Sequence, residues 1–105
     1  MAPQFLFFSV VGMRYYGNHE FNHNDENYIK LEKDQYNIHD QNAIKVLLEN
    51  RHVGYICTAD NIKVKKFMNK NKNLDIELFS SDNNRAVFIL SIRENNNKVK
   101  TKSQP

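Results

Sequence analysis

Short stretches in which apolar and polar residues alternate recur along most of the chain, and this pattern is typical of β-strands. Phe88, Leu90 and Ile92 show it most clearly, because they fall on one face of the last stretch. Residues 5–11 are apolar almost throughout, which predicts a buried strand. The six expected strands cover residues 5–11, 28–33, 44–48, 52–57, 74–79 and 86–92, with a short turn at residues 49–51 between the third and fourth.

One stretch has helical periodicity. Val64, Phe67 and Met68 share a face at helical spacing, which predicts a helix that ends near residue 70. Thr58 or Asp60 is expected to cap its start. The opposite face carries a row of lysines, Lys63, Lys66 and Lys70.

Six short strands and one helix predict a single mainly-β domain, expected to cover residues 1–94. Curling protects the edges of such a small sheet, so we expect a closed or half-closed β-barrel. Residues 95–105 are polar and basic, and we expect them to form a disordered tail.

Composition excludes several classes of protein. No apolar run approaches the roughly 18 residues of a membrane span, and no basic segment precedes the first apolar run, so a signal peptide is not expected. A single cysteine, Cys57, excludes an internal disulfide and a CxxC zinc site. We therefore expect an intracellular, cytoplasmic location and no membrane association.

The net charge of +3 is mild, but the basic residues are clustered. Such clusters can bind a polyanion, although a run of lysines also fits a solvated surface. One cluster has no acidic residue inside it, and it consists of Lys63, Lys65, Lys66, Lys70 and Lys72.

Residues 19–23, HEFNH, have the H-E-x-x-H spacing of a zinc protease. That motif works only on a helix, where both histidines share a face. Residues 17–27 are polar and rich in asparagine, so we expect a solvated loop there and no helix. We expect no metal site and no cofactor. Because no nucleophile–base pair is visible either, we do not expect an enzyme.

Arg14-Tyr15-Tyr16 offers a guanidinium for phosphate and two rings on which bases can stack. Adjacent strand residues point to opposite faces, so both rings meet one ligand only if the strand ends or bulges here. Gly12 and Gly17 permit such a break. The alternative is that one tyrosine belongs to the core and the other to the surface.

Residues 37–40, Asn-Ile-His-Asp, have the composition of an Asx-type turn that leads into the next strand. Asp40 stands directly before that strand, where its carboxylate would be held rigidly. A carboxylate repels phosphate, and it accepts a hydrogen bond from a hydroxyl group. This combination suits a terminal sugar hydroxyl better than a continuous nucleic-acid backbone.

Taken together and in order, VVGMRYYGN, LEKD, DQNAIKV and HVGYI resemble the HIRAN domain over residues 5–67. HIRAN domains occur in helicase-like transcription factor and related fork-remodelling ATPases, and as small prokaryotic or mobile-element proteins. The resemblance implies an OB-like or SH3-like barrel of about six strands with one or two short helices. It also implies binding of single-stranded DNA with capture of the free 3′-hydroxyl end.

By position, the resemblance implies that Arg14, Tyr15 and Tyr16 contact phosphate and bases. It implies that Asn37 and Asp40 hold the terminal nucleotide, with Asp40 accepting the 3′-hydroxyl. Asn42 and Ala43 start the strand and look structural.

The chain departs from the best-known member at three positions. His39 replaces a tyrosine, Tyr55 replaces a histidine, and an aromatic is missing near Ala86, where Arg85 partly compensates. We count these substitutes and two helix lysines among the DNA-binding candidates, which adds His39, Tyr55, Arg85, Lys63 and Lys66.

We therefore expect a non-enzymatic module that binds single-stranded DNA at a 3′-hydroxyl end, in DNA repair, replication or a mobile element. A helicase, another ATPase or a nuclease is the expected protein partner. The alternative is a protein-interaction module on the same fold, such as a small adaptor or inhibitor of a DNA-acting enzyme.

Overall fold

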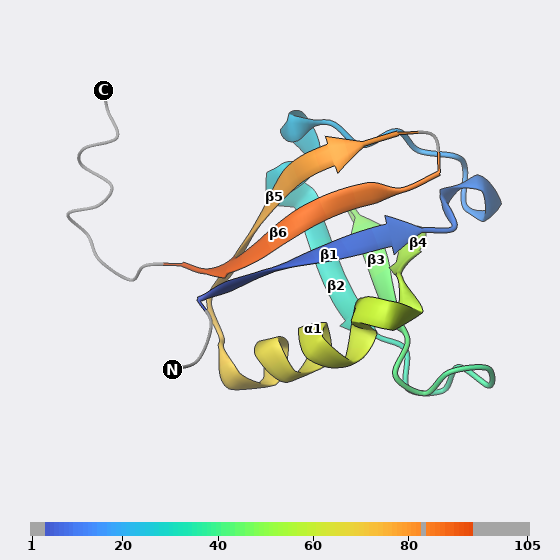
Figure 1. The fold of residues 1–105 in the computed structure, drawn as a ribbon. Coiled ribbons are helices and arrows are strands. Elements are labelled where there is room, and N and C mark those ends of the chain that lie inside the picture. Colours follow the sequence, from blue (N-terminus) through green and yellow to red (C-terminus); the bar gives the residue numbers. More distant parts are fainter. Residues whose placement is uncertain (1–3, 83, 94–105) are drawn as a thin grey trace, which may run out of the picture.

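The structure, a computed structural model, describes residues 4–82 and 84–93, so the predicted tail at 95–105 lies outside the described residues. Six strands form one antiparallel sheet in the order β2-β3-β4-β1-β6-β5, which curls into a half-barrel (Figure 1). The predicted mainly-β barrel of about six strands is confirmed. The strands are β1 (Phe5–Val11), β2 (Ile29–Lys33), β3 (Ile44–Leu48), β4 (Arg51–Ile56), β5 (Leu74–Ser81) and β6 (Ala86–Ile92).

The helix α1 (Thr58–Lys70) lies across one end of the half-barrel (Figure 1). Val64 and Phe67 are buried in the core, as the helical spacing predicted. The prediction that Thr58 or Asp60 caps the helix is wrong. Cys57 is the N-cap residue and no side chain caps the N-terminus of the helix. Asp60 instead accepts a hydrogen bond of 2.8 Å from the N–H of Ser9, which ties α1 to β1.

The core lies inside the curl of the sheet, where the rings of Phe8 and Phe88 stack with centroids 5.6 Å apart. β1 differs from the buried strand predicted for it. Only alternate residues of a strand face the core, so Phe5 and Phe7 remain 55% and 41% exposed on the other face. None of the helices among the described residues is long and apolar enough to span a membrane.

Two short 3₁₀ helices, η1 (Met13–Tyr15) and η2 (His23–Tyr28), complete the fold. The predicted loop is present at residues 17–22, but the prediction of no helix is wrong for residues 23–27, which lie in η2. Asn22 and Asp25 form a capping box that starts η2. Phe21 is only 5% exposed and packs edge-to-face on Phe88. Glu26 accepts a 2.8 Å hydrogen bond from the N–H of Leu78, which fastens η2 to the edge strand β5.

Candidate nucleic-acid interface

The segment Arg14-Tyr15-Tyr16 leaves the sheet at Gly12, as the prediction of a strand end required. Gly12 has a φ of 81°, in the left-handed region that favours glycine, and η1 follows at once. Tyr15 is 75% exposed, and the guanidinium carbon of Arg14 lies 6.0 Å from its ring centroid. Tyr16 is half-buried. The two tyrosines therefore differ, with Tyr15 open to a ligand and Tyr16 packed against the protein.

Tyr16 belongs to an aromatic cluster with His52 and Tyr55. The Tyr16 and His52 rings stack with centroids 4.0 Å apart, and Tyr55 meets both rings edge-on. The Nε2–H of His52 donates a 3.0 Å hydrogen bond to the carbonyl of Gly54. Burial lowers the pKa of His52 below its ordinary value of 6.5. The cluster thus favours a neutral imidazole beside the tyrosine rings.

A polar network continues from this cluster into the loop before β3. The hydroxyl of Tyr55 donates a 2.8 Å hydrogen bond to Asp34, and the amide of Asn37 lies 3.5 Å from the same hydroxyl. Burial, followed by the contact with Asp34, raises the pKa of Tyr55 to about 12. The same hydrogen bond lowers the pKa of Asp34. Tyr55 therefore stays protonated and Asp34 stays ionised near neutral pH.

The loop itself is built by the Asx turn that the sequence predicted. Oδ1 of Asn37 accepts hydrogen bonds from the N–H groups of His39 (2.8 Å) and Asp40 (3.0 Å). Asp40 is half-buried, and each of its carboxylate oxygens has a partner. Oδ1 accepts from the N–H of Asn42 at 2.9 Å, and Oδ2 accepts from the amide of Asn61 at 2.8 Å. These two hydrogen bonds fix Asp40 in place, and because a carboxylate offers about four acceptor positions, it can still accept a further hydrogen bond.

The sequence-predicted residues fall into three groups. Tyr16, Tyr55, Asn37 and Asp40 form one connected series through the contacts above, and His39 is exposed on the same loop. A second group surrounds a hollow of about 210 Å³ that Arg14 and Tyr15 line together with Asn84, next to the exposed Arg85. The third group, Lys63 and Lys66, lines a different hollow together with Phe5 and Ile92.

Sequence reasoning missed four residues of the first group, Asp34, His52, Asn61 and Lys65. Asn61 and Lys65 stand at i and i+4 on α1, so they share the face that meets the loop before β3. The ammonium of Lys65 donates a 3.0 Å hydrogen bond to Oδ1 of Asn42. That spacing was a usable signal. Asp34 meets Tyr55 and His52 stacks on Tyr16, contacts between residues 21 and 36 positions apart that no local pattern reports.

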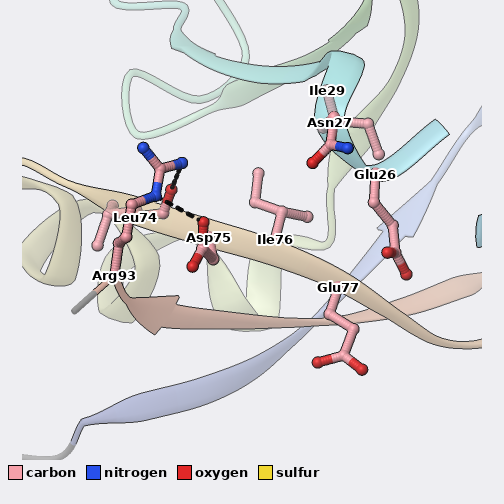
Figure 2. A pocket seen from close by; sticks show the side chains of 8 residues that line it. All are labelled: Glu26, Asn27, Ile29, Leu74, Asp75, Ile76, Glu77 and Arg93. Atoms are coloured by element: carbon pink, nitrogen blue, oxygen red, sulfur yellow. Dashed lines mark hydrogen bonds and ion pairs between the residues drawn. The ribbon is translucent and has the colours of Figure 1, made fainter. Parts of the chain in front are cut away.

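A further hollow, of about 380 Å³, is lined by residues of η2, β2 and β5 together with Arg93 (Figure 2). Glu26, Asp75 and Glu77 make its lining acidic, which is unsuited to phosphate. The guanidinium of Arg93 is turned toward Asp75, at 2.8 Å, and toward the carbonyl of Leu74 (Figure 2). We therefore place no nucleic acid here.

The two histidines of HEFNH do not share a site. His19 contacts Asp25 and His23 contacts Glu26, each at 2.9 Å. Only His23 is helical, as the first residue of η2, so the geometry that H-E-x-x-H requires is missing. Within residues 4–82 and 84–93, no three His, Cys, Asp or Glu side chains are grouped to hold a metal. That the protein uses no metal stays a prediction.

Comparison with known proteins places the chain and its fold in one family. The HIRAN domain profile matches residues 3–100. Among solved structures, the crystal structure of the HIRAN domain of human HLTF matches with a TM-score of 0.62 and 27% sequence identity. The match covers 93% of this chain and 84% of that chain. The search of curated proteins found no match.

Proposed function

Because the chain belongs to the HIRAN domain family, we propose that it binds single-stranded DNA and captures free 3′-hydroxyl ends. Membership and the structural match support a DNA-binding module. The finer assignment rests on the chemistry of the interface. The proposal includes an intracellular setting and no catalytic step by this chain, so remodelling or cleavage of DNA would require a partner such as a helicase or nuclease.

The observation that supports end capture is that the Asp40 carboxylate is fixed in position and still has acceptor positions open. Two hydrogen bonds fix its carboxylate, one from Asn42 and one from Asn61, and acceptor positions remain open. A terminal 3′-hydroxyl can donate to those positions. A 3′-phosphate, or a strand that continues, would set a phosphate against Asp40, with Asp34 on the same loop. Asp40 therefore selects a hydroxyl end.

The remaining contacts follow the two groups of residues at the interface. Tyr15 offers an open ring for a base, and Arg14 and Arg85 offer guanidinium groups for phosphates. Tyr16, His52 and Tyr55 form the aromatic wall that leads from η1 to the loop of Asn37, His39 and Asp40. We do not include Lys63 and Lys66 among the residues that contact a short single strand of DNA, because they line a separate hollow.

The test is fluorescence anisotropy with 12-nucleotide single strands that end in a 3′-hydroxyl or a 3′-phosphate. We expect the wild-type protein to bind the hydroxyl strand at least tenfold more tightly. Asp40→Asn removes the charge and keeps the shape, so it should bring the two affinities close together. Asp75→Asn, an exposed carboxylate away from the interface, is the matched control and should leave the ratio unchanged.

Equal wild-type affinity for the two ends would remove end capture and leave strand binding in place. Absence of binding to any strand at low salt would contradict both parts of the proposal. Thermal unfolding of each variant, recorded in parallel, shows whether a lost ratio reflects the interface and not the fold.

A further inference from the structure

Three phenylalanine rings form a connected aromatic row on the outer face of the sheet, at Phe5, Phe7 and Phe79. Phe7 meets Phe5 at 6.1 Å and Phe79 at 5.2 Å between ring centroids, both edge-to-face. The three residues are 55%, 41% and 62% exposed. With about 200 Å² in each side chain, the row presents roughly 300 Å² of apolar surface to solvent. A connected patch of about 300 Å² reaches the size of the largest apolar patch on many monomeric proteins, which is often functional, whereas single exposed apolar residues are ordinary.

The row continues into a lysine-rimmed hollow of about 600 Å³, which Phe5 also lines. The hollow lies where the last turns of α1 face the start of β1 and the end of β6 (Figure 1). Leu6, Phe67 and Ile92 supply its apolar wall. The rim on the α1 side is cationic, and its charged residues are Lys63, Lys66 and Lys70.

The charge of the rim is almost unopposed. Among residues 4–82 and 84–93, no acidic residue lines the hollow. Lys63 has a 3.4 Å contact with Asp60, four-fifths of whose side chain is buried, while half of the Lys63 side chain remains exposed. An occupant must therefore cover apolar surface on one side and bring negative charge on the other.

We propose that the aromatic row and the lysine-rimmed hollow form a docking surface for a peptide segment of a partner protein that carries both apolar and acidic side chains. The apolar side chains fill the hollow and cover the row, which removes that surface from water. The carboxylates face the lysine rim, which speeds association and disfavours basic partners. This surface is separate from the interface proposed for DNA.

A second copy of the chain fits this surface less well. In a symmetric dimer the same patch faces itself, so the two lysine rims would meet across the interface. A stable dimer also buries about 800 Å² on each partner, more than the aromatic row exposes.

Single-stranded DNA also fits less well. Successive bases stack on open ring faces, whereas Phe7 is in edge-to-face contact with a neighbour on both sides. Asn61, the residue that holds Asp40, lies on the opposite face of α1 from the lysine rim, because at about 100° per residue Lys63, Lys66 and Lys70 are roughly 140–200° around the helix from it.

The test begins with a phage-displayed library of random 16-residue peptides selected on the full-length chain. We expect the enriched peptides to combine Asp or Glu with large apolar residues. The strongest peptide is then synthesised with a fluorescent label, and its affinity is measured for three variants. Lys66→Glu and Phe7→Ser should each weaken binding at least tenfold. Lys30→Glu, an exposed lysine on β2, is the matched control and should change affinity by less than twofold.

Competition distinguishes the peptide from other occupants. An excess of a 3′-hydroxyl single strand should leave the labelled peptide bound, because the two surfaces are separate. Displacement by that strand, or loss of strand binding in Lys66→Glu, would assign the lysines to nucleic acid and overturn the proposal. Binding of anionic phosphatidylserine vesicles that Lys66→Glu abolishes would assign the surface to a membrane. Failure to enrich acidic, apolar peptides would also overturn it.

Discussion

The side-chain amide of Asn61 donates a 2.8 Å hydrogen bond to Oδ2 of Asp40 and joins the first turn of α1 to the loop before β3. Asn61 is only 2% exposed. Its neighbour Asp60 accepts a hydrogen bond from the N–H of Ser9, so two adjacent helix residues hold strand β1 and the loop before β3. The carboxylate that we propose to read the DNA end is therefore oriented from the helix.

Asn61→Ala should reduce the preference for a 3′-hydroxyl end, because Asp40 loses one of the two bonds that orient it. We expect the ratio of hydroxyl to phosphate affinities to fall several-fold, with a loss of about 1 kcal/mol in unfolding free energy. Anisotropy with both strands and urea unfolding measure the two effects. Lys65→Ala, which removes a bond to Asn42 and leaves Asp40 untouched, should keep the ratio. If Asn61→Ala left the ratio of hydroxyl to phosphate affinities unchanged, Asn61 would contribute to stability alone.

The stability of the fold should decrease as pH falls below about 6.5, because of His52. Burial chiefly lowers its folded-state pKa and Lys45 lowers it further, while the Gly54 carbonyl, Asp34 and Glu32 oppose the shift. Between that lowered pKa and 6.5 the unfolded chain binds more protons than the folded chain, so protonation favours unfolding. The contribution of His52 to the free energy of unfolding is fully present above pH 6.5, and it is lost as pH falls from 6.5 through the lowered pKa.

Urea unfolding at pH 7.5 and pH 5.5 tests the contribution of His52. His52→Asn should show a smaller loss between the two pH values than the wild-type protein. His39→Asn, in which an exposed histidine on the loop before β3 is replaced, is the comparison for nonspecific loss of a titrating group. Equal losses in the wild-type protein and His52→Asn would contradict the assignment.

Local sequence patterns were sufficient for most of the strands. The predicted bounds of the first and last strands agree with β1 and β6. In β6 the core-facing residues recur with a period of two, whereas β1 was indicated by its nearly continuous apolar run. Gly12 marked the end of β1 for a physical reason, since the chain turns there through a positive φ. The Asx turn at Asn37 was equally local.

Contacts between distant residues were the part that sequence could not supply. Phe21 is a lone aromatic in a polar, asparagine-rich stretch, and nothing periodic shows that it packs on Phe88. Asp60 has the composition of a helix cap, yet its carboxylate binds Ser9, 51 positions earlier. Helical spacing placed Lys63 and Lys66 on a solvated face, but not beside Phe5 across the lysine-rimmed hollow.

Neutralising the two lysines should leave DNA binding nearly unchanged. Lys63→Gln combined with Lys66→Gln should keep the affinity for a 12-nucleotide 3′-hydroxyl strand within twofold, because both residues line the separate hollow. Arg14→Gln should weaken the same strand and reduce the slope of log K against log salt by about 0.7, the value for one lost single-strand phosphate contact. Titrations at several salt concentrations measure both slopes. A reduced slope of log K against log salt in the double lysine variant would show that these lysines contact DNA phosphates.

The two adjacent tyrosines should respond differently to alanine substitution, because one is exposed and the other is packed. Tyr15 is 75% exposed, so Tyr15→Ala should change unfolding free energy by no more than about 0.5 kcal/mol. It should weaken single strands by about 1–3 kcal/mol, the value of one base stacked on an aromatic ring. Tyr16 stacks on His52 at 4.0 Å, so Tyr16→Ala should reduce stability as well as binding.

Tyr28→Ala is the control for Tyr15→Ala, because Tyr28 is 58% exposed at the end of η2, away from the interface. Thermal unfolding and anisotropy on the same preparations separate the two effects. Tyr15→Ala should weaken 3′-hydroxyl and 3′-phosphate strands by the same factor, because a stacking ring does not sense the terminus. A selective loss for hydroxyl ends would instead place Tyr15 at the terminal nucleotide beside Asp40. If Tyr15→Ala bound single-stranded DNA as tightly as the wild-type protein, we would conclude that the DNA does not contact the ring of Tyr15 on η1.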